Sequence, residues 1–132
     1  MNHSIGTRRR GGFDSNLSYT SALIAANVAV FIGVLILMGF FGDDLIVSWI
    51  ALMPAMILEG RGVWTFLTSM FMHAGIGHLF VNMVSLMFIG SFVEKLIGKK
   101  RFISLYFIGG LFAGLFFVLI ALATGSDLNV YA

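Results

Sequence analysis

Residues Gly77–Leu96 read GHLFVNMVSLMFIGSFVEKL, and this stretch decides the fold class because it is apolar and long enough to cross a membrane. A spanning helix needs about 20 apolar residues to cross about 30 Å of hydrocarbon. No Asp, Glu, Lys or Arg occurs between Arg61 and Glu94, as expected where a central charge costs about 2.5–3.5 kcal/mol. His78 and Asn82 make this stretch less uniformly apolar than a simple anchor, so we expect it to carry chemistry.

Two further charge-free gaps each accommodate one more span, which we predict near Ala22–Phe41 and Phe102–Ala123. The composition agrees, because the chain of 132 residues is 59% hydrophobic and 11% charged, with a mean hydropathy of +1.00. Soluble domains average about 25% charged residues, so a soluble globular domain and a disordered chain are both excluded. The sequence predicts an all-α membrane protein.

The absence of cysteine removes several kinds of chemistry at once. Thiolate metal sites, thiol nucleophiles and disulfides all need cysteine, and the sequence has none. A histidine metal site is also disfavoured, because His73 and His78 are five residues apart, do not align on a helix and have no third ligand nearby. The net charge of +2 points only weakly to nucleic acid, and we expect no nucleic-acid partner.

The basic residues divide unevenly between the two sides that three spans create. Seven lie on one side and Arg61 alone lies on the other. The positive-inside rule therefore predicts a cytoplasmic N-terminus and a cytoplasmic turn at Gly98–Arg101, with the first loop and the C-terminal tail outside. Residues 1–19 are expected to form a basic leader, most simply a disordered one without a partner, and residues 20–132 one partial membrane domain. The seven are Arg8, Arg9, Arg10, Lys95, Lys99, Lys100 and Arg101.

The first loop, residues 42–72, is unusually apolar for a segment between two spans. Pro54, Gly60 and Gly62 divide it into short pieces. We predict short helices at the outer membrane boundary, anchored by Trp49 and Trp64 as interfacial aromatic residues. The alternative is an apolar cap that packs on the bundle and has no function of its own.

His78 and Asn82 lie one helical turn apart, so their side chains share a face, with Asn82 about 6 Å deeper in the membrane. Polar groups at that depth are costly unless they are paired or line a wet cavity, so this face is expected to look into the bundle. Two fixed donors aimed at one point could stabilise a developing oxyanion, each by roughly 3 kcal/mol. The alternative is that both side chains only hydrogen-bond neighbouring helices.

No nucleophile accompanies these donors. Ser85 lies on nearly the same face as His78 but about 10 Å away along the helix, whereas a nucleophile and its base must approach to about 2.6–3.2 Å. Ser85 and Ser91 are more typical of helix interfaces or of bonds to the preceding turn. Three other serines, Ser69, Ser104 and Ser126, have no evident histidine partner. The residues alone therefore give half of an active site.

Three segments together resemble the opening half of the rhomboid intramembrane serine proteases. They are Trp64-x-x-Leu-Thr-Ser-Met-Phe-Met-His73, then His78-x-x-x-Asn82, then Gly90-x-x-x-Glu94-Lys-x-x-Gly98. The resemblance is strong over residues 64–101. It extends weakly to Asn27-Val28 and to three glycines of the third span, Gly109, Gly110 and Gly114.

The resemblance implies three of the six spans of a bundle in which a serine on the fourth span, in a Gly-x-Ser-Gly setting, is activated by a histidine on the sixth. It assigns oxyanion stabilisation to His78 and Asn82. It gives supporting positions to His73 and Trp64 in the preceding loop, and to Glu94 and Gly98 at the cytoplasmic turn. The family often has arginine directly after the tryptophan, where this chain has Thr65, and the sequence leaves open whether Arg61 replaces it.

Three functions follow as expectations. The first is the N-terminal half of a rhomboid protease that ends before the catalytic serine. It would be inactive alone, need no metal or organic cofactor, and have a transmembrane protein substrate, the lipid bilayer and the missing C-terminal half as partners. The second is a non-catalytic rhomboid-like protein that binds spanning helices, and the third is an orphan three-span protein. With half of the bundle absent, we expect the isolated chain to be marginally stable or to self-associate.

Overall fold

The computed structural model describes residues 18–125, and within that range it contains helices and no strand. Three stretches are long and apolar enough to cross a membrane: Tyr19–Phe41, Ile76–Ile97 and Lys99–Thr124. The prediction of three spans is therefore confirmed, with slightly longer bounds than expected. The basic residues Arg8–Arg10 and the C-terminal Ser126 lie outside the described residues.

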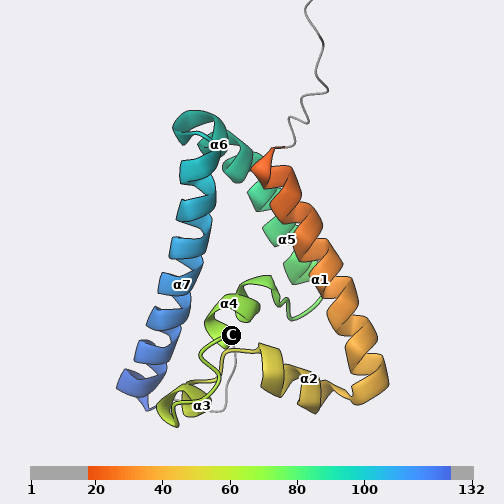
Figure 1. Cartoon of the computed structure of the whole chain (residues 1–132), viewed down its shortest axis with the longest axis vertical. Coiled ribbons are helices and arrows are strands. Elements are labelled where there is room, and N and C mark those ends of the chain that lie inside the picture. Colours follow the sequence, from red (N-terminus) through yellow and green to blue (C-terminus); the bar gives the residue numbers. More distant parts are fainter. Residues whose placement is uncertain (1–17, 126–132) are drawn as a thin grey trace, which may run out of the picture.

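The three spans form an open wedge (Figure 1). Helices α1 (Tyr19–Phe41) and α7 (Lys99–Thr124) approach each other near α6 (Ser91–Ile97) and diverge toward the opposite end. The second span consists of α5 (Ile76–Ser85), a π-helical turn over Leu86–Gly90, and α6, and it lies beside α1.

The closed end of the wedge depends on Gly90, which is buried where all three spans meet. A β-carbon at this position would lie 2.8 Å from Leu86 Cδ1 and 3.3 Å from Phe102 Cζ, and it would touch Thr20 of α1 at 3.4 Å. Small residues let membrane helices pack closely, and a larger residue here would require the Leu86 and Phe102 side chains to shift. The π-helical turn that ends at Gly90 is a feature often found near functional sites.

The first loop fills the wide end of the wedge. It forms α2 (Asp43–Ile50), α3 (Pro54–Leu58), α4 (Thr65–Thr68) and a 3-10 turn over Ser69–Phe71, so the predicted short helices are present. The segment between α2 and α3 is deeply buried among the described residues, because Ala51 and Leu52 are both 0% exposed.

The first loop packs against two glycines of α7, Gly110 and Gly114. Met70 fills the space beside Gly110 that a β-carbon would need, and Phe66 and Leu52 lie 3.0 and 3.1 Å from the corresponding position of Gly114. The glycine pair therefore packs against the loop and its short helices, whereas the spacing alone indicates only a general helix-packing signal. The loop is an integral part of the bundle.

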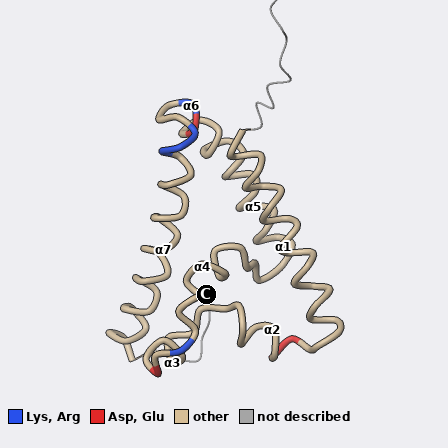
Figure 2. Tube along the Cα trace, in the orientation of Figure 1, with Lys and Arg blue, Asp and Glu red and all other residues tan. Residues whose placement is uncertain are grey.

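Charged residues gather at the two ends of the spans (Figure 2). One end carries four basic residues around the turn between α6 and α7, together with Glu94. The other end carries three acidic residues and Arg61, which pairs with Glu59. Among the described residues, four basic side chains thus lie at one end and Arg61 at the other, as the sequence predicts. The assignment of each end to one side of the membrane remains a prediction.

Candidate functional site

The predicted pair, His78 and Asn82, lies on α5 one turn apart. The structure does not place both at one cavity, because His78 is exposed and only Asn82 lines the space between the spans. Asn82 lines two cavities: one of about 370 Å³ between α1, the second span and α7, and one of about 560 Å³ that faces the glycines of α7. Its side chain is half-buried and makes no hydrogen bond to any of residues 18–125. The carboxamide N–H groups are therefore free to donate into the space between the spans.

His73, in the loop before α5, lies against His78. The centres of the two imidazole rings are 5.4 Å apart in an edge-to-face arrangement, and the His73 ring is similarly placed 6.3 Å from the ring of Phe31 on α1. The loop brings the two histidines together, which helical spacing does not. Among residues 18–125 no three His, Cys, Asp or Glu side chains are grouped closely enough to hold a metal ion.

Burial favours the neutral form of the His73 imidazole. Burial lowers the pKa of this imidazole below its ordinary value; a hydrogen bond with the Phe71 carbonyl opposes the change, and the neighbouring His78 adds to it. Nδ1 of His73 lies 3.1 Å from that carbonyl oxygen, so the neutral tautomer with a proton on Nδ1 donates this bond. His73 is thus held neutral and oriented beside His78.

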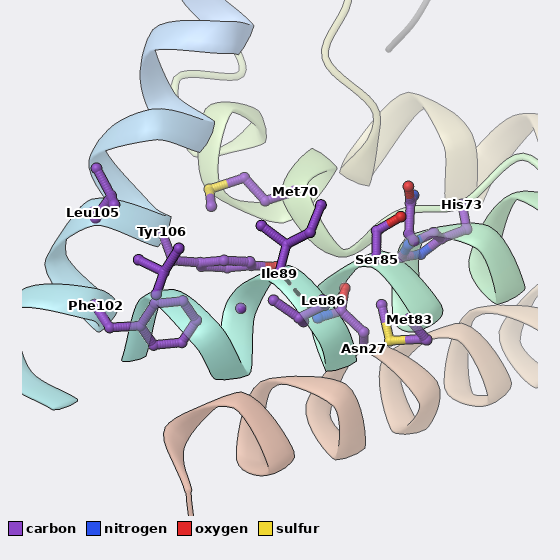
Figure 3. Close-up of a pocket in the computed structure, with 13 residues that line it drawn as sticks. Asn27, Met70, His73, Met83, Ser85, Leu86, Ile89, Phe102, Leu105 and Tyr106 are labelled. Atoms are coloured by element: carbon purple, nitrogen blue, oxygen red, sulfur yellow. Dashed lines mark hydrogen bonds between the residues drawn. The ribbon is translucent and has the colours of Figure 1, made fainter. Parts of the chain in front are cut away.

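The first cavity contains a polar contact that the sequence analysis missed (Figure 3). The side chain of Asn27, which is 1% exposed, donates to the Tyr106 hydroxyl at 3.3 Å and to the Leu23 carbonyl at 2.8 Å. This contact joins α1 to α7 across the cavity. The available signal was an amide in the middle of an apolar span, where polar side chains usually face the bundle interior.

Apolar side chains make up most of the remaining cavity wall, including Met70, Leu86, Ile89 and Phe102. An apolar wall around a few polar groups strengthens their electrostatic effect on a bound charge. Ser85 also lines this cavity, but among residues 18–125 it makes no hydrogen bond to a histidine. The structure therefore gives no reason to assign it as a nucleophile.

Glu94 caps α1 from a distance of about 75 residues in sequence. Its Oε2 accepts from the Ser18 hydroxyl at 2.6 Å and from the N–H and hydroxyl of Thr20 at 2.8 and 2.6 Å, and its Oε1 accepts from the Tyr19 N–H at 2.9 Å. Free N–H groups at a helix start attract a carboxylate. Gly98, with φ +85°, allows the abrupt turn from α6 into α7.

Trp64 supports the first loop. Its Nε1 donates to the Trp49 carbonyl at 2.9 Å, and the two indole rings lie 6.2 Å apart, which joins the start of α4 to α2. Trp64 lines a separate cavity from the one that contains His73 and Asn82. Thr65, where the family often has arginine, is buried and donates to the Gly62 carbonyl at 2.6 Å.

The family model of the Rhomboid domain matches residues 60–129. Inactive RHOMBOID-like protein 8 of Arabidopsis thaliana is 40% identical over 72 residues, which cover 54% of this chain and 19% of that protein. Rhomboid protease GluP of Bacillus subtilis (strain 168) is 30% identical over 94 residues, or 71% of this chain and 18% of that protein.

Rhomboid protease GlpG of Salmonella newport (strain SL254) is 31% identical over 81 residues, which cover 61% of this chain and 29% of that protein. This chain thus spans less than a third of the length of each of these relatives. No solved structure matches it significantly. The match over more than half of the chain, together with three spanning helices, shows that this multi-pass membrane protein belongs to the rhomboid family.

Proposed function

We propose that the chain is the N-terminal part of a rhomboid intramembrane serine endopeptidase, in which His78 and Asn82 stabilise the oxyanion. One observation carries the proposal: the half-buried carboxamide of Asn82 has no hydrogen-bond partner among residues 18–125 and lines an apolar cavity between the spans. Polar side chains within a spanning helix usually face a bundle interior or a water-filled cavity and mark a functional site, which supports a functional use of this amide.

The chemistry follows from where charge develops. When a hydroxyl attacks a peptide carbonyl, negative charge grows on the carbonyl oxygen, and donors already in place stabilise it without reorganising. Asn82 would supply a carboxamide N–H and His78 an imidazole N–H. His73, held neutral by burial, would orient His78 through their ring contact.

We assign neither the nucleophile nor its base to any residue of this sequence. The family resemblance places them in a Gly-x-Ser-Gly segment and in a histidine of later spans, and the 132 residues contain no Gly-x-Ser-Gly segment. On this proposal the 132 residues alone do not hydrolyse peptides. The substrate would be a membrane protein cleaved in or near its transmembrane helix.

A second function is a non-catalytic rhomboid-like protein that binds transmembrane helices. It is favoured by the 40% identity to a relative whose name describes it as inactive. Reading the coding sequence beyond Ala132 separates the two proposals. A Gly-x-Ser-Gly segment followed by a later histidine supports the protease, and a continuing bundle without them supports the binding protein.

The kinetic test uses the full-length protein in proteoliposomes with a transmembrane reporter substrate. Asn82→Ala is expected to lower kcat by about 10²–10³-fold while changing KM little, because the lost interaction exists only in the transition state. Ser104→Ala is the matched control, since this exposed serine bonds only the Lys100 carbonyl of its own helix. An equal change in kcat and KM, or no change, contradicts the role of Asn82.

A further inference from the structure

The turn between α6 and α7 carries a concentrated positive charge. Four basic side chains surround it: Lys95, Lys99, Lys100 and Arg101. Among residues 18–125, Glu94 is the only carboxylate at this end, which leaves a net charge of +3 from four cations and one anion. The oxygens of Glu94 already accept four hydrogen bonds from the start of α1. The carboxylate therefore neutralises only part of this charge.

A cavity of about 420 Å³ lies beside this turn, between the start of α1 and the α6–α7 junction. The Glu94 carboxylate, which the start of α1 already engages, is part of its wall, as are Ser18 and Gly98. Lys95 and Lys99 complete the wall, together with the hydroxyls of Ser21 and Ser91. Among the described residues neither of these serines has a hydrogen-bond partner, and Lys95 has no carboxylate within 4 Å. Lys99 lies over the ring of Tyr19, with 6.0 Å between its Nζ and the ring centre. The wall therefore offers hydroxyl and ammonium donors to an anion.

The same cavity borders a surface suited to hydrocarbon. Phe92 and Leu96, which are 67% and 72% exposed, each follow a cavity-lining residue by one position on α6. Because successive helical residues are about 100° apart, these two side chains form a stripe beside Ser91 and Lys95. A soluble anion gains nothing from that stripe, whereas a lipid can place its acyl chains along it.

We propose that this cavity, which we call the headgroup pocket, binds the phosphodiester headgroup of an anionic membrane lipid. Lys95 and Lys99 neutralise the phosphate, Ser21 and Ser91 donate to its oxygens, and the acyl chains follow Phe92 and Leu96. Basic pockets at the ends of spanning helices recognise anionic headgroups by this combination of charge and hydrogen bonds. The lipid would join the start of α1 to the α6–α7 turn, opposite the wide end of the wedge.

Native mass spectrometry of the full-length protein tests the proposal. The protein is released from micelles that contain equal amounts of phosphatidylglycerol and phosphatidylcholine with identical acyl chains. The lining variant K95Q/K99Q is compared with K100Q/R101Q, which removes the same charge from residues that do not line the pocket. Ser91→Ala removes a hydroxyl and leaves every charge in place, and sn-glycerol 3-phosphate is the probe for the headgroup alone.

Wild-type protein is expected to retain phosphatidylglycerol in preference to phosphatidylcholine. The lining pair should weaken that binding about 25-fold, or about fivefold per lysine, and at least five times more than the control pair. Ser91→Ala should weaken it roughly threefold while circular dichroism shows unchanged helix content. Equal retention of the two lipids, or equal loss in the two charge pairs, overturns the pocket. Glycerol phosphate binding as tightly as the lipid shows an adventitious anion site only and overturns the lipid assignment.

Discussion

Replacing Glu94 by alanine removes the hydrogen bonds between this carboxylate of the second span and the start of α1. The carboxylate is 6% exposed and accepts four hydrogen bonds from Ser18, Tyr19 and Thr20. Losing a helix cap costs about 0.5–2 kcal/mol, and a buried donor without a partner costs about 1–3 kcal/mol more. Thr20 is 1% exposed, so water cannot replace the lost acceptor there. We expect Glu94→Ala to lower the free energy of unfolding by about 3 kcal/mol.

The assay is unfolding in mixed micelles of increasing sodium dodecyl sulfate fraction, followed by far-ultraviolet circular dichroism. Glu59→Ala is the matched control, because this carboxylate makes only an exposed ion pair with Arg61, and such pairs contribute about 0–1 kcal/mol. A Glu94→Ala protein as stable as the Glu59→Ala protein would refute the capping role. Ser18→Ala should give an intermediate loss of about 1 kcal/mol, since it removes one of the four bonds.

Three further predictions use the same unfolding measurement. Gly90→Ala should destabilise the bundle by about 1–3 kcal/mol because its β-carbon would lie too close to Leu86 Cδ1. Gly33→Ala is the control and should be neutral, because a β-carbon there has nothing within 4 Å. Equal effects of the two substitutions would contradict the close packing at Gly90. Tyr106→Phe should cost about 0.6 kcal/mol by removing the bond between α7 and α1, and a loss above about 2 kcal/mol would indicate a different role. The free energy of unfolding should be constant above about pH 6.5 and fall as the pH drops toward the folded pKa of His73, which is lower than the unfolded pKa. The reason is that, as the pH falls, the unfolded imidazole binds a proton before the folded one does. His73→Gln should abolish this slope.

The spans could be predicted from the sequence because charges are costly in hydrocarbon. Spanning segments therefore appear as charge-free stretches that can be read without knowing the fold. The gap between Arg61 and Glu94 predicts a span wherever the rest of the chain lies. The placement of His78 and Asn82 one turn apart on a single helix was predictable for a similar reason, since helical periodicity is local. Neither prediction needed knowledge of tertiary contacts.

The remaining features depend on residues that are distant in sequence. Glu94 bonds Ser18, which is 76 residues away in the sequence, and no local sequence pattern predicts that contact. Asn27 meets Tyr106 across 79 residues. The contact of His73 with His78 depends on the path of a loop, which periodicity does not describe. Packing of the first loop against the α7 glycines likewise follows only from the folded arrangement.

The central claim is that the face of α5 bearing Asn82 looks into a hydrated space between the spans. The chain contains no cysteine, so single-cysteine labelling has no background. In bilayers, a charged thiol reagent should modify Asn82→Cys rapidly, and Val81→Cys, which is 61% exposed on another face of the same helix, slowly. Rapid labelling at position 82 with protection at position 81 is the predicted result. Protection at 82, or equal rates at both positions, would contradict the claim.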